Sequence, residues 1–359
     1  MNYNIGIIGG GQLGAMMAIE AHKMGYTVAC LDPTSNCPAS FIVDKMIVGE
    51  YNDLEKLNEL GNITDHLSYE FENVPGKTLE LLNNKFDIPQ GIQPLLDSQD
   101  RLIEKDNANK HGLKTAKYYK VDTFEELRDA IFNLGLPCIY KTRREGYDGH
   151  GQVVIQSIND MEKVKNEYLG KTQGIVEEMI HFDYETSLIL VRSKDKTIHF
   201  PMGLNIHKDG ILDLCEVPLN INQDLEKRIV EASTKFMESA NYYGILTIEF
   251  FIKGNDFYFN EMAPRPHNSG HYTIEGCSTN QFKELDKFVL GLELEKPELV
   301  HKCVMKNILG RDLINIEKLK QIRGACVHMY NKEVSRPLRK MGHITYIDLN
   351  LEEYNNYLK

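Results

Sequence analysis

Short apolar runs alternate with polar, helix-like stretches over the first hundred residues. Residues 5–8 predict a buried strand, residues 15–24 predict a helix, and residues 27–31 predict a second strand that ends at Asp32. A strand, a turn, a helix and a strand in this order are typical of a doubly wound α/β domain. In such a domain ligands bind beyond the carboxyl ends of the strands, so we expect a binding site after residue 8.

The pattern changes after residue 97, where the chain becomes charged and helical over residues 98–111. Residues 135–149 then predict a strand that runs into a glycine-rich turn. Further strands are predicted at 174–179, 186–191, 245–252 and 257–260, and helices at 223–240 and 278–291. This succession is typical of an α+β domain and not of a continued parallel array.

The tail of the chain, from about residue 300, holds several short strand candidates. Gly310, Asn331 and Gly342 are turn signals between them, which favours a small β-rich module. We therefore expect an N-terminal α/β domain at 1–98, a central α+β domain at 99–295 and a C-terminal β-rich domain at 296–359.

Composition narrows the class of protein. The 359 residues carry a formal net charge of −11, which argues against a general nucleic-acid or anionic-membrane binder. No apolar run approaches the roughly 20 residues that span a bilayer, and the N-terminus reads directly as a strand, so we expect a cytoplasmic protein. The seven cysteines form no C-x-x-C pair, so spacing predicts neither a disulfide framework nor a zinc site.

Glycines at 9, 11 and 14 match G-x-G-x-x-G directly after the first predicted strand. Such a turn lets backbone N–H groups approach an anion, and Asp32 lies where a ribose-binding acid of a dinucleotide site would be expected. A tight turn that merely needs glycine, and a phosphate-bearing ligand other than a dinucleotide, are equally compatible with this pattern.

Two glutamates lie at the open end of a predicted hairpin. Glu249 sits in an apolar strand and Glu261 ends the next one, with residues 253–256 between the strands. A carboxylate in a buried strand is costly unless a cation compensates it, and oxygen-rich sites of this kind suit Mg²⁺ that bridges phosphates. Lys141 ends a strand just before a glycine-rich loop, where its ammonium could neutralise phosphates.

These residues carry a resemblance that covers nearly the whole chain. The sequence resembles the ATP-grasp enzymes and, among them, the N5-carboxyaminoimidazole ribonucleotide synthetase family. The matching runs are residues 7–14 (IIGGGQLG), 69–75 (YEFENVP), 99–101 (QDR), 146–149 (GYDG), 260–271 (NEMAPRPHNSGH) and 339–343 (RKMGH). The resemblance implies a pre-ATP-grasp α/β domain, an ATP-grasp domain with a lid at about 113–184, and the β-rich C-terminal domain.

The resemblance also implies the parts of a site for ATP, with Mg²⁺ or Mn²⁺ as the metal. Glu249 and Glu261 would hold the metal, and Glu185 would bind the ribose. The implied ATP-binding residues are Arg101, Lys141, Gly146, Tyr147, Asp148, Gly149, His150, Gly151, Gln152, Glu177, Glu178, Met179, Ile180, Glu185, His207, Asn260 and Glu261.

Aminoimidazole ribonucleotide is the implied second substrate, together with bicarbonate. The residues implied to bind it are Gln12, Leu13, Glu70, Tyr147, Lys332, Arg339 and Lys340, with Glu72 as a further candidate. The implied reaction is that of a carbon–nitrogen ligase of purine biosynthesis, in which ATP activates bicarbonate as carboxyphosphate. Asp148, Arg265 and His267 would be the catalytic residues, with Asp148 as base and the other two holding the small anion.

The sequence departs from the family pattern in the lid loop. His150 stands where the family has a Lys or Arg, and Glu145 replaces a glycine, so the charge and the hinge of the loop both differ. The family analogy also implies a homodimer that binds small molecules and neither nucleic acid nor membranes.

Three other functions remain alternatives. A formate-dependent glycinamide ribonucleotide transformylase shares the fold and the acyl-phosphate chemistry, although residues 69–75 and 264–271 favour the carboxylating enzyme. An NAD-dependent oxidoreductase would rest on the glycine turn and Asp32 alone. A catalytically inactive nucleotide-binding regulator is disfavoured by the presence of both Glu249 and Glu261.

Overall fold

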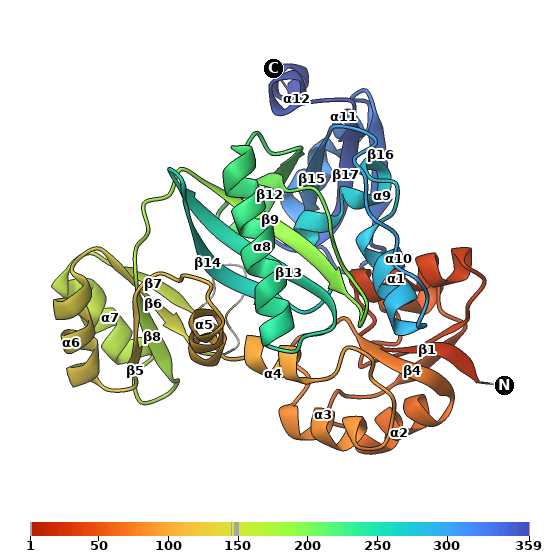
Figure 1. Cartoon of the computed structure of the whole chain (residues 1–359), viewed down its shortest axis with the longest axis horizontal. Coiled ribbons are helices and arrows are strands. Elements are labelled where there is room, and N and C mark those ends of the chain that lie inside the picture. The colour runs from red at the N-terminus through yellow and green to blue at the C-terminus, as the bar shows by residue number, and fades with distance from the viewer. Residues whose placement is uncertain (1, 145, 147–150, 359) are drawn as a thin grey trace.

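Four parallel strands form the sheet of the N-terminal part, in the order β3–β2–β1–β4. The computed structural model describes residues 2–144, 146 and 151–358, and its path is shown in Figure 1. The strands are β1 (Tyr3–Ile8), β2 (Val28–Asp32), β3 (Lys45–Val48) and β4 (Thr64–Tyr69). The helical segments are α1 (Gln12–Lys23), η1 (Pro38–Phe41), α2 (Leu54–Asn62) and α3 (Gly76–Asn83). The predicted strand–turn–helix–strand unit is confirmed.

A second sheet of four strands stands apart, at the left of Figure 1, with the order β5–β8–β6–β7 and antiparallel pairing throughout. Its strands are β5 (Tyr118–Val121), β6 (Cys138–Thr142), β7 (Gln152–Ile155) and β8 (Gly174–Glu178). Helices α6 (Phe124–Leu134) and α7 (Ile158–Glu167) pack on it around a core of its own. Helices α4 (Gln93–Ser98) and α5 (Arg101–Lys110) lead into it from the N-terminal part.

The central sheet has nine strands in the order β14–β13–β9–β11–β12–β15–β17–β16, with β10 paired to β9. The strands are β9 (Tyr184–Arg192), β10 (Thr197–His199), β11 (Gly203–Lys208), β12 (Ile211–Val217), β13 (Gly244–Lys253), β14 (Asp256–Ala263), β15 (Cys303–Leu309), β16 (Ala325–Met329) and β17 (Lys340–Ile347). The remaining helical segments are α8 (Gln223–Ser239), η2 (Asn268–Gly270), α9 (Thr273–Gly276), α10 (Gln281–Val289), η3 (Gly310–Asn315), α11 (Ile316–Lys320) and α12 (Leu351–Leu358). Helix α8 covers one face through Leu225, Ile229 and Phe236.

The C-terminal strands do not form a sheet of their own. β15 pairs with β12, so β15, β16 and β17 extend the central sheet. The turn expected at Gly342 is wrong, because this residue lies inside β17. A Cβ there would lie 2.5 Å from the carbonyl oxygen of His328, so close strand approach and not a turn explains this glycine.

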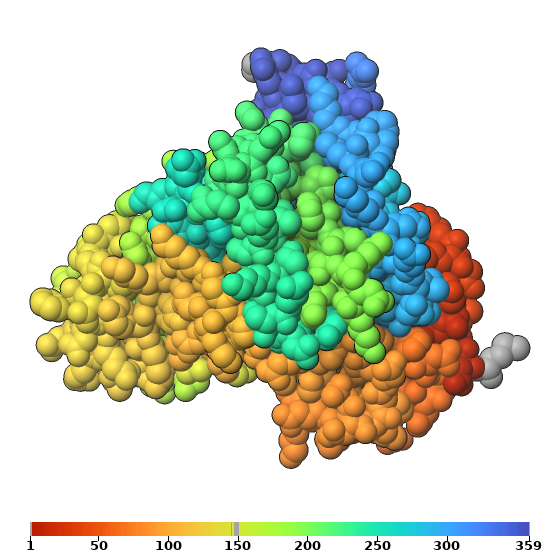
Figure 2. Space-filling view, viewed as in Figure 1, coloured from red at the N-terminus to blue at the C-terminus, as the bar shows by residue number. Residues whose placement is uncertain are grey.

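The sheet of β5, β6, β7 and β8, which we call the lid sheet, lies beside α5, and α5 in turn contacts β14 of the central sheet (Figure 1). Figure 2 shows the same arrangement in a space-filling view. Within the described ranges, no helix is long and apolar enough to cross a membrane.

Candidate active site

The two carboxylates of the β13–β14 hairpin lie side by side. Glu249 and Glu261 are register partners, so their side chains leave the same face of the sheet. The register shifts directly after Glu249, because Phe250 pairs with Phe259 and Asn260 is the extra residue of a bulge. This hairpin therefore presents the carboxylates of Glu249 and Glu261 and the amide of Asn260 on paired strands, as the sequence predicted.

The two glutamates differ in charge state. Burial, and then the charge of Glu261, raise the pKa of Glu249 to about 8. Burial would raise the pKa of Glu261 as well, but the nearby Arg101 and Lys141 outweigh it and hold that pKa below its ordinary value. Arg101 donates from Nη1 to Oε2 of Glu261 at 3.0 Å. Glu261 is thus the ionised member of the pair.

A group of buried cations adjoins Glu261. Arg101 and Lys141 were predicted, and Lys105, which was not, lies with them and is 1% exposed. Both lysines contact one carboxylate, that of Glu177, with Lys141 Nζ 3.1 Å from Oε2 and Lys105 Nζ 3.3 Å from Oε1. Lys105 also donates to the backbone carbonyl of Asn260 at 3.1 Å. The spacing of four residues from Arg101 places Lys105 on the same face of α5, which is the sequence signal that could have found it.

Glu177 is in contact with two lysines of this group. Burial would raise its pKa, but Lys105 and Lys141 outweigh that effect and hold it low. The carboxylate positions the two ammonium groups, so three cations meet Glu177 and Glu261 and retain a surplus of positive charge. Such a surplus suits a polyphosphate.

A cavity of about 280 Å³ opens between the lid sheet and the central sheet. Predicted residues in its wall are Arg101, Lys141, Gln152, Glu177, Glu178, Met179, Ile180, Glu185, His207, Asn260 and Glu261. Apolar residues that the sequence interpretation missed complete it: Ala116, Ile139, Phe182, Leu212 and Phe251. The rings of Phe182 and Phe251 stack at 4.6 Å with an interplanar angle of 6°. The cavity therefore has both charged and apolar lining residues, which suit the phosphates and the base of a nucleoside phosphate.

Part of the predicted lid loop lies outside the described residues: Tyr147, Asp148, Gly149 and His150, together with Glu145. The flanks of the loop are described. Gly146 accepts a hydrogen bond from Arg101 at its carbonyl, and Gly151 has a φ of +72° where a Cβ would clash with Thr142. The carboxylate of Asp100 contacts the two arginines that precede the loop. It accepts two hydrogen bonds from Arg143 (2.9 and 2.7 Å) and lies 3.2 Å from Nε of Arg144.

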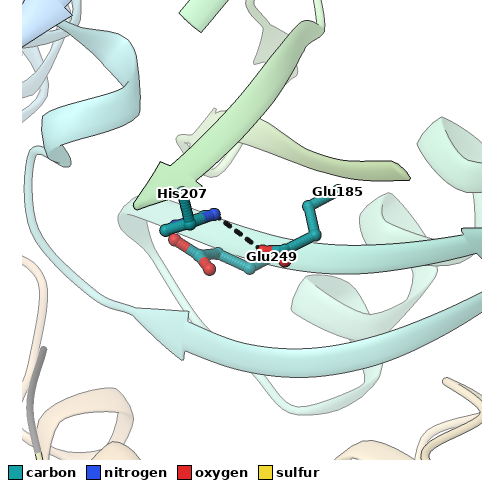
Figure 3. A group of neighbouring side chains, drawn as sticks. All are labelled: Glu185, His207 and Glu249. Carbon is teal, nitrogen blue, oxygen red and sulfur yellow. Dashed lines mark ion pairs between the residues drawn. The ribbon is translucent and has the colours of Figure 1, made fainter. Parts of the chain in front are cut away.

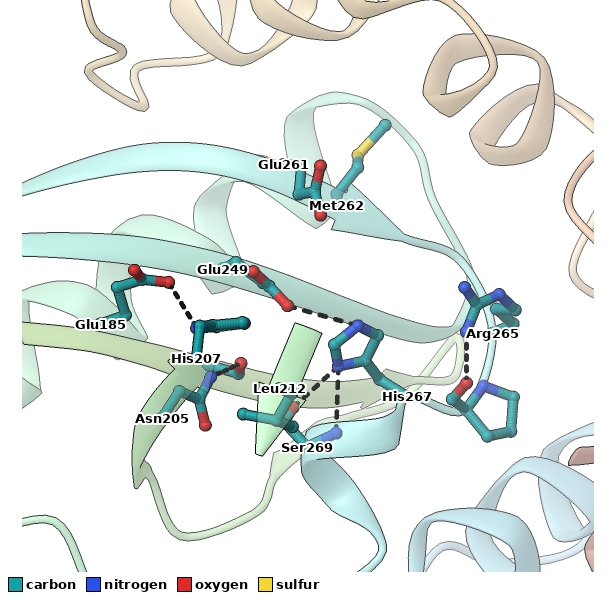
Figure 4. Close-up of polar contacts among 12 residues, drawn as sticks. Glu185, Asn205, His207, Leu212, Glu249, Glu261, Met262, Arg265, His267 and Ser269 are labelled. Carbon is teal, nitrogen blue, oxygen red and sulfur yellow. Dashed lines mark hydrogen bonds and ion pairs between the residues drawn. The ribbon is translucent and has the colours of Figure 1, made fainter. Parts of the chain in front are cut away.

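A second cavity, of about 300 Å³, continues from the first and shares Arg101, Glu249, Glu261, His267 and Lys340 with it. Arg265 and His267 line this second cavity, and Figure 4 shows the polar contacts of both side chains. Nε2 of His267 lies 3.3 Å from Oε1 of Glu249, and Nδ1 lies 2.8 Å from the hydroxyl of Ser269. Burial lowers the pKa of His267 well below its usual range, so this imidazole is neutral near pH 7. Arg265 pairs with Glu72 at 2.7 Å.

The third cavity, of about 490 Å³, lies at the carboxyl end of β1. Gln12, Glu70, Lys332 and Arg339 line it, as predicted for the ribonucleotide site. Two other predicted members are elsewhere: the side chain of Leu13 is buried in the core, and Lys340 lines the first two cavities.

The glycine turn binds an anion of the protein itself. The carboxylate of Glu70 accepts from the backbone N–H of Gly11 at 2.7 Å and of Gly14 at 3.4 Å. Asp32 accepts from the N–H groups of Gly10 and Thr34 and from the hydroxyl of Tyr51, each at 2.8 Å. Asp32, the acid expected to serve a dinucleotide, is thus occupied within the fold, and the turn is part of the third cavity.

Three family models match successive parts of the chain. The ribonucleotide synthetase pre-ATP-grasp domain matches residues 1–95, the ATP-grasp domain residues 106–282, and the phosphoribosylaminoimidazole carboxylase C-terminal domain residues 303–357.

Curated and solved relatives cover the chain from end to end. The N5-carboxyaminoimidazole ribonucleotide synthase of Staphylococcus aureus (strain MRSA252) is 40% identical over 100% of this chain and 99% of its own length. The structure of an N5-carboxyaminoimidazole synthetase from Staphylococcus aureus complexed with ADP has a TM-score of 0.94 at 38% identity, over 99% of this chain and 96% of that one. The Aspergillus clavatus enzyme in complex with ADP and 5-aminoimidazole ribonucleotide has a TM-score of 0.91 at 28% identity, over 100% of this chain and 97% of that one.

Proposed function

The chain belongs to the N5-carboxyaminoimidazole ribonucleotide synthetase family, and from this premise we propose how its own residues carry out the family's reaction. The protein is an ATP-grasp ligase of purine biosynthesis, which carboxylates 5-aminoimidazole ribonucleotide to the N5-carboxyamino product with conversion of ATP to ADP and phosphate. One observation carries the assignment of roles. The buried cations and the carboxylate pair lie at the junction of a nucleotide-shaped cavity and a second cavity lined by Arg265 and His267.

ATP would occupy the first cavity with its base near Phe182 and Phe251 and its ribose near Glu185 and His207. Its phosphates would lie against Arg101, Lys105 and Lys141, where the positive surplus stabilises the charge that spreads over the transferring group. The loop at 146–152 would cover them. Glu177 would hold both ammonium groups in place, since one of its carboxylate oxygens contacts each lysine.

Mg²⁺ fits the donor set of the hairpin. Glu249, Glu261 and the amide of Asn260 are hard oxygen ligands on paired strands, and the raised pKa of Glu249 marks a carboxylate that gains from a nearby cation. When bound there, Mg²⁺ or Mn²⁺ would neutralise charge on the phosphates of ATP. Glu261, whose pKa Arg101 and Lys141 hold below its ordinary value, would be one of the two carboxylate ligands.

Bicarbonate would bind in the second cavity, beside the γ-phosphate. The guanidinium of Arg265 is held by Glu72 at 2.7 Å, and the neutral imidazole of His267 can donate a hydrogen bond from Nε2. These two groups would orient one bicarbonate oxygen toward phosphorus, and phosphoryl transfer gives carboxyphosphate and ADP. Exclusion of water from the closed site protects that intermediate.

The ribonucleotide would occupy the third cavity, with its 5′-phosphate near Lys332 and Arg339 and its aminoimidazole toward Glu70 and Gln12. Leu13 can contribute only its backbone N–H at the start of α1, because its side chain is buried. Lys340 would contact the carboxyl donor, not the 5′-phosphate. Attack of the amine on carboxyphosphate, or on CO₂ released from it, needs a base, for which Asp148 and the neighbouring Tyr147 remain our proposal.

We propose a homodimer, a cytoplasmic location and no nucleic-acid or membrane partner, in keeping with a biosynthetic enzyme that uses small-molecule substrates.

The experiment that tests this function follows the carboxyl carbon. ¹⁴C-labelled bicarbonate should be incorporated into the ribonucleotide only when ATP and Mg²⁺ are both present, in equal amount to the ADP formed. ADP formation without incorporation of label would refute the assignment. Glycinamide ribonucleotide with formate is the matched control for the sister activity, and it should yield no ADP.

A further inference from the structure

A second group of metal-type ligands lies in the first cavity and shares only Glu249 with the hairpin pair. Glu185 on β9, His207 on β11 and Glu249 on β13 each offer one ligand atom, and these atoms all lie within 4.8 Å of one another (Figure 3). β9 pairs with both β11 and β13, which is why residues far apart in the sequence converge here.

The donor chemistry of this group differs from that of a magnesium site. One imidazole nitrogen with two carboxylates is a set that suits Zn²⁺ and similar transition metals, which accept three protein ligands and keep one position open. Mg²⁺ prefers oxygen ligands in an octahedral arrangement and rarely takes imidazole. The three side chains therefore favour a borderline transition metal over the metal of the phosphate-transfer reaction.

The surroundings of the group are ordered by contacts already in place. Nδ1 of His207 lies 2.8 Å from Oε2 of Glu185. His267 lies 3.3 Å from Glu249 and is itself held by Ser269, so it can orient Glu249 from outside the ligand set, as outer partners of metal sites do (Figure 4). The Glu185 and His207 side chains are 20% and 22% exposed, which leaves the group open to an ion entering through the cavity.

We propose that the nucleotide-free protein binds one divalent transition-metal ion, Zn²⁺ or Co²⁺, at Glu185, His207 and Glu249. Metal binding at this site is separate from the carboxylation reaction. Only the expected competition between this metal and ATP rests on the proposed function. Glu185 and His207 are the proposed ribose contacts, and Glu249 is shared with the proposed magnesium site. A bound transition metal therefore excludes ATP, and Zn²⁺ inhibits the enzyme competitively with ATP.

The test is a titration of the full-length, nucleotide-free protein with Co²⁺ in the absence of Mg²⁺. We expect a visible absorption band that saturates at one equivalent and is bleached by one equivalent of Zn²⁺. His207→Gln and Glu185→Gln should each weaken Co²⁺ binding by about 100-fold, since even outer partners of a metal site cost 10–100-fold. The matched control is His199→Gln, because His199 is an exposed histidine at the edge strand β10. Circular dichroism melting of each variant shows whether it is folded.

Two results would overturn the proposal: no saturable band in the wild-type protein, or an unchanged band in folded His207→Gln and Glu185→Gln. The metal titration involves no turnover, and carboxylation is measured separately with excess Mg²⁺ and no transition metal. Carboxylation without a Co²⁺ absorption band would contradict the metal site alone. A Co²⁺ absorption band without carboxylation would contradict the proposed function alone.

Discussion

Glu70 places its carboxylate against the backbone N–H of Gly11, at 2.7 Å, inside a turn whose glycines match a dinucleotide-binding pattern. A Cβ on Gly11 would lie 2.6 Å from Oε1 of Glu70, so the glycine is needed for this internal contact and not for the approach of a pyrophosphate. The carboxylate that the turn binds is part of the chain, and the turn thereby fixes Glu70 at the wall of the third cavity.

Gly11→Ala should displace Glu70 and weaken ribonucleotide binding. We expect the KM for aminoimidazole ribonucleotide to rise about 10-fold, in line with the loss of one hydrogen bond to a charged group, while the KM for ATP stays within about twofold. Steady-state kinetics with each substrate varied in turn provides the measurement. An equal rise in both constants would mean that the turn supports the whole fold and not this site.

Arg339→Ala should also act on the ribonucleotide alone. Arg339 lines the third cavity, so its loss should raise the KM for the ribonucleotide by about 10-fold and leave the KM for ATP roughly unchanged. Lys340→Ala is the informative comparison, because Lys340 lines the other two cavities and should mainly lower kcat. A selective rise in the ATP constant of Arg339→Ala would reverse the allocation of the phosphate sites.

Replacing either hairpin glutamate by glutamine should impair phosphoryl transfer without unfolding the protein. Glu261→Gln removes the ionised carboxylate and should lower kcat by about 10²-fold or more, because an electrostatic contact in a closed site typically has that effect. Its requirement for Mg²⁺ should shift to higher concentration. Near wild-type kcat in Glu261→Gln at low Mg²⁺ would refute the metal assignment.

Glu104 should make stability fall as pH rises. Burial, and then the charge of Glu261, raise the pKa of Glu104 to about 8, and the side chain is 2% exposed. The folded state therefore holds a proton that the unfolded state releases near pH 4.5, the ordinary pKa of a glutamate side chain. The contribution of Glu104 to the free energy of unfolding is fully present below about pH 4.5. It is lost as pH rises through about 8, at up to about 1.4 kcal/mol per pH unit.

Glu104→Gln tests that contribution. Glutamine imitates the protonated acid and keeps an acceptor for the N–H of Met262, so the free energy of unfolding of the variant should fall less than that of the wild type between pH 6 and pH 8. Denaturant unfolding of the nucleotide-free proteins at both pH values gives the comparison, with the exposed Glu238→Gln as control. Parallel pH profiles for the wild type and Glu104→Gln would show that the Glu104 carboxyl does not titrate in this range.

Local pattern predicted much of the site, because its key residues end or begin regular elements. Glu249 and Glu261 follow from alternation within two adjacent strands, and Lys141 follows from the end of β6. Lys105 and its ion pair with Glu177 escaped prediction because the contact joins α5 to β8, across 72 positions of chain, and nothing local signals such a pair. The burial of Leu13 was missed for a similar reason, since the core that covers it includes Ile189 of β9 and Phe282 of α10.

The local sequence pattern also could not predict which sheet the C-terminal strands join. The sequence predicts short strands without bounds from about residue 300, and β15, β16 and β17 lie there, but alternation cannot say which edge a strand joins. Their place in the central sheet depends on the pairing of Leu214 with Lys306, which only the folded chain reveals.

The sites for ATP, bicarbonate and the ribonucleotide all serve the transfer of one γ-phosphate. Release of phosphate from ATP tests this relationship most directly. Phosphate released from Mg·ATP should be followed with bicarbonate present, with and without aminoimidazole ribonucleotide, and with formate in place of bicarbonate. We predict rapid release only when bicarbonate and the ribonucleotide are both present. Equal release without the ribonucleotide, or release driven by formate with glycinamide ribonucleotide, would contradict the account.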